Sequence, residues 1–241
     1  MPLEILPDAA AVARALADLF VDVGLAAQAD RGSFHVALSG GNTPRAAYEL
    51  LGAESMAEQL SWSDVFVYFG DERCVPPDDE QSNYRMTERA FLEFVPIPPA
   101  NVHRIRGEIE PAAAAAEYAE VLRTDLGNPP CFDLVLLGLG PDGHTASLFP
   151  GTPPDTDNDA LVRAAYSESQ AMWRVTITPK VINAARTVAF AVEGVEKTAI
   201  LATVLEGPRD PTKYPAQIVA PESGNLVWLV DELAAGMLKT K

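Results

Sequence analysis

The stretch Asp-Leu-Val-Leu-Leu-Gly-Leu-Gly-Pro-Asp-Gly-His-Thr-Ala-Ser-Leu-Phe-Pro-Gly, residues 133–151, decides how the rest of the chain is interpreted. Its apolar run 134–137 does not alternate with polar residues, which predicts a strand buried on both faces, as in a parallel sheet. The run ends in a turn rich in backbone breakers, namely Gly138, Gly140, Pro141 and Gly143. Asp142 and His144 fall inside this turn. Since open α/β sheets bind ligands beyond the carboxyl ends of their strands, His144 is well placed to meet a substrate. The alternative is that His144 caps a helix or satisfies the loop.

Alternating strands and helices surround this stretch. Strands are expected at 34–38, 65–69, 102–105, 162–165, 173–177, 187–192 and 226–230. Helices are expected at 9–27, 44–51, 83–95, 111–126, 179–185 and 195–205, and a surface loop rich in Pro and Asp at 152–159. This order predicts an α/β fold with a doubly wound, mostly parallel, Rossmann-like sheet flanked by helices. We expect one domain over residues 1–241.

Composition narrows the classes of function. The chain has 241 residues, 48% of them hydrophobic, and a formal net charge of -16. Nucleic acids and anionic membranes require a basic face, so neither is an expected partner. No signal peptide or membrane-spanning stretch is expected, and two cysteines suit a reducing cytoplasm. Three histidines and two cysteines show no zinc-ligand spacing, so we expect neither a metal nor another cofactor. The oligomeric state is left open, with a monomer favoured.

The segment Ser39-Gly40-Gly41-Asn42-Thr43-Pro44 has the parts of an anion-binding turn. Two glycines let backbone N–H groups approach a ligand closely. The predicted helix that follows directs the positive end of its dipole at the turn, with Thr43 as the expected N-cap and Pro44 as the first helical residue. The alternative is a plain strand-to-helix turn. The glycine spacing matches neither the dinucleotide-binding fingerprint nor the nucleotide-triphosphate loop.

The segment Gly70-Asp71-Glu72-Arg73 places two acids and a base after the predicted strand 65–69. In an active site, one acid would orient the substrate or share a proton with it, and Arg73 would contact its oxygens; elsewhere such a segment is a solvated turn. Arg174 and Lys197 are further candidate phosphate ligands, although each alone is an ordinary surface cation. Lys197 lies in the first turn of a predicted helix, where the dipole disfavours a cation unless an anion is bound.

Five segments in this order resemble the 6-phosphogluconolactonase family. They are Leu-Ser-Gly-Gly-Asn-Thr-Pro (38–44), Gly-Asp-Glu-Arg-Cys-Val-Pro (70–76), Ser-Asn-Tyr (82–84), Leu-Gly-Leu-Gly-Pro-Asp-Gly-His-Thr-Ala-Ser-Leu-Phe-Pro-Gly (137–151) and Arg-Val-Thr-Ile-Thr-Pro (174–179). The resemblance implies hydrolysis of 6-phospho-D-glucono-1,5-lactone to 6-phosphogluconate, the second step of the oxidative pentose phosphate pathway. It also implies a fold shared with glucosamine-6-phosphate deaminases and, more distantly, with sugar-phosphate sensors.

Carried over by position, the resemblance implies that His144 is the general base and that Asp71 and Arg73 occupy active-site positions. It implies phosphate binding by Ser39, Gly40, Gly41, Asn42, Thr43, Arg174 and Lys197. The chemistry is consistent with these residues, because a lactone is an activated ester that needs only a base for water and donors for the oxyanion. Those donors are either backbone N–H groups around 138–143 or Arg73. Asp142 can hold the tautomer of His144 only if the turn folds back.

Two other functions are compatible with parts of this pattern. An aminosugar-phosphate deaminase-isomerase also carries an Asp-Gly-His turn, but it has a glutamate five residues after the histidine, where this chain has Phe149. A non-catalytic sugar-phosphate sensor would usually be fused to a DNA-binding segment, which the acidic N-terminus does not resemble. Both are therefore less favoured than the lactonase.

Overall fold

The structure is a computed structural model, which describes residues 2–151 and 159–239. Within these ranges a parallel sheet has the strand order β1-β10-β9-β6-β2-β3-β5. The strands are β1 (Leu3–Leu6), β2 (Phe34–Leu38), β3 (Val65–Phe69), β5 (Val102–His103), β6 (Leu134–Leu137), β9 (Thr187–Val192) and β10 (Asn225–Asp231). A smaller antiparallel sheet has the order β4-β8-β7, formed by β4 (Asp71–Arg73), β8 (Met172–Ile177) and β7 (Val162–Ser167).

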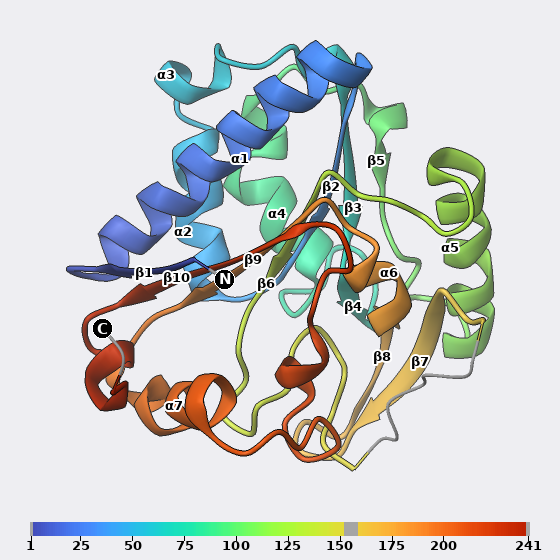
Figure 1. Cartoon of the computed structure of the whole chain (residues 1–241). Helices are drawn as coiled ribbons and strands as arrows, with labels where there is room; N and C mark the ends of the chain where they lie inside the picture. Colours follow the sequence, from blue (N-terminus) through green and yellow to red (C-terminus); the bar gives the residue numbers. More distant parts are fainter. Residues whose placement is uncertain (1, 152–158, 240–241) are drawn as a thin grey trace.

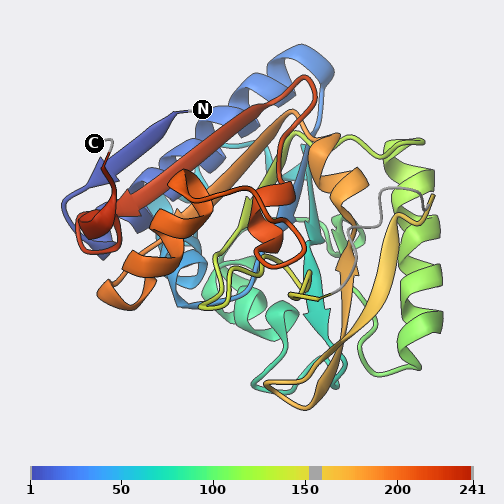
Figure 2. The ribbon, with the colours of Figure 1, turned by 60° about the horizontal axis from the view of Figure 1, so that its bottom comes forward.

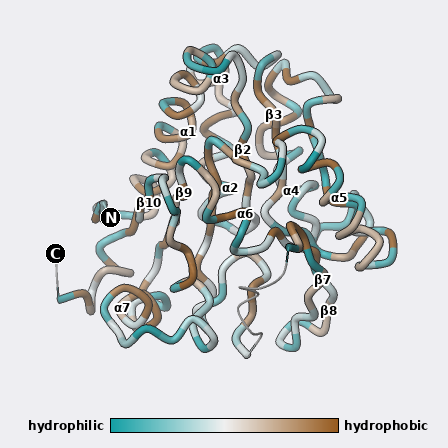
Figure 3. The backbone as a smooth tube through the Cα atoms, turned by 45° about the vertical axis from the view of Figure 1, so that its right-hand side comes forward, coloured by the Kyte–Doolittle hydropathy of each residue, from teal (hydrophilic) through white to brown (hydrophobic). Residues whose placement is uncertain are grey.

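Helices cover both sheets (Figure 1). They are α1 (Ala9–Arg31), α2 (Asn42–Leu51), α3 (Glu54–Ala57), α4 (Asn83–Ala90), α5 (Pro111–Leu126), α6 (Pro179–Asn183) and α7 (Thr198–Glu206). Helix α1 packs beside α2 and against β2, β9 and β10, whereas α5 lies along β7 and β8, as Figure 2 also shows. The coil of α1 carries both hydrophobic and hydrophilic colours in Figure 3, as expected of an amphipathic helix with one buried face. No helix in the described ranges is long and apolar enough to cross a membrane.

The strand predictions at the centre of the chain are confirmed. β2, β3, β6 and β9 have the expected bounds, and all four residues of β6 are buried. This burial explains why an unbroken apolar run forms a strand here, since β6 lies between β2 and β9 with neighbours on both edges.

Several element boundaries differ from the expectations. The helix expected at 83–95 ends at Ala90 and is followed by a 3₁₀ turn, Leu92–Phe94. The helix expected at 195–205 begins as a 3₁₀ turn, Val195–Lys197, and α7 follows it. β1 was not anticipated, because it is a four-residue strand at the edge of the sheet and Glu4 interrupts its apolar residues. Of the loop expected at 152–159, residues 152–158 lie outside the described ranges.

The order of the strands reverses between β2 and β6. From β2 the chain proceeds outward through β3 to β5, and it then returns to β6 on the opposite side of β2 before continuing to β9 and β10. Loops that follow β2 and β6 therefore leave the sheet in diverging directions, and a crevice opens between them at the carboxyl ends of the strands. The turns singled out in the sequence lie at this position.

Candidate active site

A cavity of about 340 Å³ lies at the carboxyl ends of the central strands. Turns that follow β2, β6 and β9 supply most of its lining, β4 contributes Asp71 and Arg73, and β8 contributes Arg174. All the residues predicted for the site line this cavity, namely Ser39, Gly40, Gly41, Asn42, Thr43, Asp71, Arg73, His144, Arg174 and Lys197. The structure thus brings them together, while the role of each stays a prediction.

The first turn of α2 faces this cavity with unused backbone donors. Helix α2 begins at Asn42 and its N-cap is Gly41, whose φ of 113° is a conformation that favours glycine. The expectation that Thr43 is the N-cap is therefore wrong, because the glycine turn lets the helix begin one residue before it. No side chain caps the helix, and the N–H groups of Asn42 and Thr43 have no acceptor within it. These donors and the helix dipole suit an anion.

Two neighbours position the turn before α2. The hydroxyl of Tyr48 donates to the carbonyl of Ser39 (3.0 Å) and accepts from its N–H group (3.1 Å). A Cβ atom on Gly40 would lie 1.9 Å from Oδ1 of Asn83, so the buried amide of Asn83 fills the space that a side chain would need. The turn therefore requires a glycine at position 40 because Asn83 packs directly beneath it.

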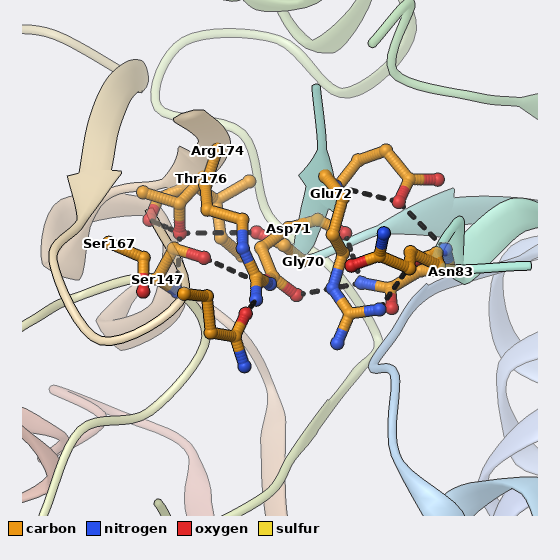
Figure 4. Close-up of polar contacts among 12 residues, drawn as sticks. Gly70, Asp71, Glu72, Asn83, Ser147, Ser167, Arg174 and Thr176 are labelled. Atoms are coloured by element: carbon orange, nitrogen blue, oxygen red, sulfur yellow. Dashed lines mark hydrogen bonds and ion pairs between the residues drawn. The ribbon is translucent and has the colours of Figure 1, made fainter. Parts of the chain in front are cut away.

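Asp71 is buried at the edge of the cavity and is surrounded by donors (Figure 4). Nδ2 of Asn83 donates to Oδ1 (3.1 Å) and to the backbone carbonyl of Asp71 (2.8 Å). The hydroxyl of Ser147 donates to Oδ2 (2.6 Å), and Nη1 of Arg174 lies 3.5 Å from the same oxygen. The carboxylate is thus held from three sides.

Glu72 has a different environment from Asp71. The residues 71–73 form the strand β4 rather than a turn, so consecutive side chains point to opposite faces and only Asp71 and Arg73 line the cavity. The Glu72 carboxylate accepts from the N–H groups of Asn83 (2.7 Å) and Tyr84 (2.9 Å) and so caps the start of α4. Burial raises the pKa of Glu72, against the effect of these hydrogen bonds. Its role is to anchor α4.

Two arginines line the cavity with incomplete hydrogen bonding. The guanidinium of Arg174 donates to Oε1 of Gln170, and that of Arg73 donates to the carbonyl of Gln81. Burial lowers the pKa of Arg174 from its ordinary value, and the nearby Asp71 opposes that effect. Nε of each arginine and the hydroxyl of Ser39 are buried without a hydrogen-bond partner among the described residues. Buried donors of this kind are normally satisfied, which is consistent with a site built to receive ligand oxygens.

The turn after β6 does fold back on itself. N–H of Gly140 donates to the carbonyl of His144 (2.8 Å), and N–H of Gly143, with a φ of 83°, donates to the carbonyl of Gly140 (3.0 Å). The imidazole of His144 lies so close to the backbone that a Cβ atom on Gly140 would be 2.1 Å from Nδ1. Only glycine at position 140 leaves room for the ring.

This geometry brings Nδ1 of His144 within 2.5 Å of Oδ1 of Asp142, so the condition for Asp142 to hold the imidazole tautomer is met. Burial acts to raise the pKa of Asp142, but the imidazole and the hydrogen bonds from the ring and backbone of His144 outweigh it and keep this pKa below its ordinary value. Nε2 of His144 makes no hydrogen bond with a described residue. The imidazole ring packs at an angle against the ring of Phe149, with 5.2 Å between their centroids.

Lys197 lines the cavity from the end of the 3₁₀ turn that precedes α7. It was expected inside the first turn of an α-helix, but Gly194, with a φ of 94°, starts a tighter turn and α7 begins only at Thr198. Lys197 forms no ion pair within the described ranges, and Glu193 and Glu196 line the cavity beside it. Its ammonium group remains available for an anionic ligand.

Sequence reasoning assigned no role to several residues that the structure places in the lining or directly behind it. Asn83 was noticed only as part of Ser-Asn-Tyr, a short polar motif that could have indicated a site. Gln170 lines the cavity from the turn between β7 and β8, and Ser147 lies behind Asp71; neither has a distinctive local pattern. Among the described residues, no group of three or more His, Cys, Asp or Glu side chains is placed to hold a metal ion.

The fold and the cavity together define an α/β enzyme in which an uncapped helix end and a histidine line one cavity. A family model for glucosamine-6-phosphate isomerases and 6-phosphogluconolactonases matches residues 7–228. The chain belongs to this family.

Named relatives and solved structures agree with this assignment. A 6-phosphogluconolactonase of Synechocystis sp. is 42% identical over 216 residues, covering 88% of this chain and 87% of that protein. The structure of a 6-phosphogluconolactonase from Trypanosoma brucei is similar with a TM-score of 0.82 and 28% identity, covering 98% of this chain and 97% of that chain. A monomeric glucosamine-6-phosphate deaminase reaches a TM-score of 0.85 at 18% identity, covering 98% of this chain and 100% of the other, a likeness in fold alone.

Proposed function

We propose that this chain hydrolyses 6-phospho-D-glucono-1,5-lactone to 6-phosphogluconate, with His144 as the general base. The single observation that carries the proposal is the contact of 2.5 Å between Nδ1 of His144 and Oδ1 of Asp142, in a cavity that the uncapped start of α2, Arg174 and Lys197 also line. With Nδ1 protonated toward the carboxylate, the lone pair of the imidazole is on Nε2, which makes no hydrogen bond with a described residue. That nitrogen is free to accept a proton from water.

The reaction follows from this arrangement. Nε2 of His144 takes a proton from water as the water oxygen attacks the lactone carbonyl carbon, and the carbonyl oxygen becomes an oxyanion. Backbone N–H groups around 138–143 or the guanidinium of Arg73 stabilise that charge. The carbonyl reforms as its bond to the ring oxygen breaks, and the imidazolium returns a proton to the departing alkoxide. Loss of a final proton from the carboxylic acid gives the open-chain 6-phosphogluconate.

The phosphate group is assigned to the helix end and the cations that line the cavity. The uncapped N–H groups of α2, the ammonium of Lys197 and the guanidinium of Arg174 supply donors and positive charge there. The net charge of -16 repels an anionic substrate at long range, so these local donors have to hold it. The proposal assigns recognition of the substrate's phosphate group to these donors.

The main alternative is an aminosugar-phosphate deaminase, which shares the fold. Phe149 packs against His144 at the position where the deaminase pattern has a glutamate, so the carboxylate needed for that proton relay is missing. Purified protein should be incubated separately with freshly generated lactone and with glucosamine 6-phosphate. The proposal expects acid release from the lactone above its spontaneous rate, and no ammonia from the amino sugar. Ammonia release, or a lactone rate equal to the spontaneous one, would contradict it.

The proposal extends to how the protein works in the cell. We place it in the cytoplasm as a monomer with one α/β domain over residues 1–241. Cys74 and Cys131 are both free thiols, which fits a reducing compartment. Sedimentation of the purified chain tests the monomer, and cell fractionation tests the location.

A further inference from the structure

Asp71 is the residue of the cavity whose side chain has the most hydrogen-bonding partners, and its chemical role is open. We propose that Asp71 is a positioning residue, which with Ser147 and Asn83 fixes the turn carrying His144 relative to Arg174 and to the anion-binding turn. The inference rests on the proposed function, because it assigns a part in that reaction. It also implies that Asp71 is not the base that activates water.

The environment of the carboxylate supports a positioning role. Asp71 is only 6% exposed, and both of its side-chain oxygens already accept hydrogen bonds, Oδ1 from Asn83 and Oδ2 from Ser147. The guanidinium of Arg174 lies beside Oδ2 as well. A general base has to reach the water it deprotonates with a free lone pair. A carboxylate enclosed by donors on both oxygens is better suited to hold those donors in place.

The partners of Asp71 come from separate segments, each of which carries another part of the site (Figure 4). Ser147 lies three residues after His144. Arg174 belongs to β8, and Asn83 starts α4 and fills the space beneath Gly40 of the anion-binding turn. One carboxylate thus connects the base, the cation and the phosphate end of the cavity.

The turn after His144 needs such support. Ala146 has a φ of 47°, a left-handed conformation that costs a residue with a side chain roughly 1–3 kcal/mol unless its surroundings hold it. The next residue, Ser147, is held twice, since its hydroxyl donates to Asp71 and its N–H group donates to Oγ1 of Thr176 (3.2 Å). The strained residue therefore lies between His144 and the contact with Asp71. Loss of that contact would let the turn relax and shift the imidazole.

The test replaces Ser147 by alanine and uses Ser167→Ala as a matched control. Ser167 is a similarly buried serine at the end of β7, and its hydroxyl pairs with that of Ser169 (3.3 Å), outside the cavity. We expect Ser147→Ala to lower kcat by about 10- to 100-fold, because small displacements of a catalytic group have effects of that size. KM should change less than about twofold, since the phosphate donors stay in place. Ser167→Ala should leave both constants unchanged.

A second variant, Asp71→Asn, separates positioning from base catalysis and covers the case in which Ser147→Ala fails to fold. If Asp71 is a positioning residue, Asp71→Asn should lower kcat, and the acid limb of the pH–rate profile should keep its midpoint. The double variant Ser147→Ala/Asp71→Asn should then be little slower than Asp71→Asn alone, because both changes break the same contact. If Asp71 is the base, the acid limb disappears in Asp71→Asn.

Each result bears on a different statement. Equal kcat values for Ser147→Ala and Ser167→Ala, in an active wild-type background, would overturn the positioning role and leave the lactonase intact. An acid limb that vanishes in Asp71→Asn would overturn it too. A wild-type protein without lactonase activity would instead refute the proposed function. Binding of 6-phosphogluconate, followed by calorimetry, checks that each variant keeps a folded site.

Discussion

Atoms within its own turn set the orientation and the tautomer of the His144 ring. Gly140 leaves room for the ring, Gly143 lets the backbone reverse, and Asp142 accepts from Nδ1. The three supports lie within four residues of the histidine, so the sequence segment 140–144 contains nearly everything that orients the imidazole. An imidazole held in this way exposes Nε2 and needs no further residue to select its tautomer.

Replacing His144 by alanine should lower kcat by about 10²–10⁴-fold, the usual contribution of a general base. Binding of 6-phosphogluconate should be nearly unchanged, because the phosphate donors remain. The wild-type rate should also fall at low pH, because a protonated Nε2 has no lone pair with which to accept a proton from water. Initial rates at high enzyme concentration, corrected for spontaneous hydrolysis, measure both effects. A kcat near the wild-type value with an unchanged acid limb would assign the base to another residue.

Removal of the Lys197 ammonium tests the phosphate end of the cavity. Lys197→Ala should mainly raise KM, by roughly 10- to 100-fold, since a charge-assisted contact contributes about 1.5–3 kcal/mol and phosphate binding is similar in the ground and transition states. Lys213, an exposed lysine outside the cavity, provides the control, and Lys213→Ala should leave KM unchanged. Equal KM values for the two variants would remove Lys197 from the phosphate site.

Helix α2 and the turn before it act as one element in the site. Gly41 caps the helix without a side chain, which leaves the N–H groups of Asn42 and Thr43 for a ligand. Gly40 lets the turn lie flat on the amide of Asn83, whose Nδ2 is already committed to Asp71. The direction in which the helix end points therefore depends on α4 packing beneath it.

The substitution Gly40→Ala adds only one carbon atom, but it should disturb this element strongly. The new Cβ would lie 1.9 Å from Oδ1 of Asn83, and that amide cannot move without losing its hydrogen bonds to Asp71. We expect a higher KM and a loss of stability of about 1–3 kcal/mol, typical of overpacking. Gly236→Ala is the control, since the nearest atom to a Cβ there is 3.5 Å away. Matching KM and unfolding midpoints for the two variants would contradict the packing argument.

At the scale of the whole molecule, histidines far from the cavity couple stability to pH. His35 in β2 stacks on Phe66 (4.7 Å between centroids), and His103 in β5 stacks on Tyr68 (4.5 Å) beneath α5. Burial lowers the pKa of both histidines, although Asp125 partly opposes it. Both rings are therefore kept neutral in the folded state more strongly than in the unfolded chain.

The direction in which pH changes the stability follows from the difference in proton binding between the folded and unfolded states. Below the unfolded pKa of about 6.5, the unfolded chain binds more protons than the folded protein, so the free energy of unfolding falls as the pH is lowered through and below that value. Each histidine contributes a slope of up to about 1.4 kcal/mol per pH unit. Urea unfolding between about pH 5.5 and 8 should show this loss, and His35→Gln/His103→Gln should flatten it.

The difference between the wild type and that double variant isolates the histidines. Glu72, with a pKa raised by burial, acts with the opposite sign above its ordinary pKa, but it is present in both proteins. Identical slopes in the wild type and the double variant would show that the buried rings do not titrate as argued.

The sequence alone determined the parts of this protein that depend on near neighbours. The buried strands 34–38, 65–69, 134–137 and 187–192 could be predicted, because a short apolar run bounded by turn residues is typical of a buried strand in an α/β protein. Every predicted site residue lines the cavity, because glycine turns after parallel strands meet at one edge of the sheet. The ends of helices were predicted less accurately. Helix α2 starts at Asn42 because Gly41 adopts a positive φ angle, which the sequence does not specify.

The tertiary structure decided what depends on distant partners. It separated Asp71, in the cavity, from Glu72, which anchors α4, although the two acids are neighbours in the sequence. It paired Asp71 with Ser147, 76 positions away, and placed Asn83 under Gly40. Such contacts follow from how β4 pairs with β8 and how α4 packs on the turn before α2, and no local pattern encodes them. Hydrogen bonds between distant segments form only after the sheet has brought those segments together, which is why the sequence assigned no role to Ser147 or Asn83.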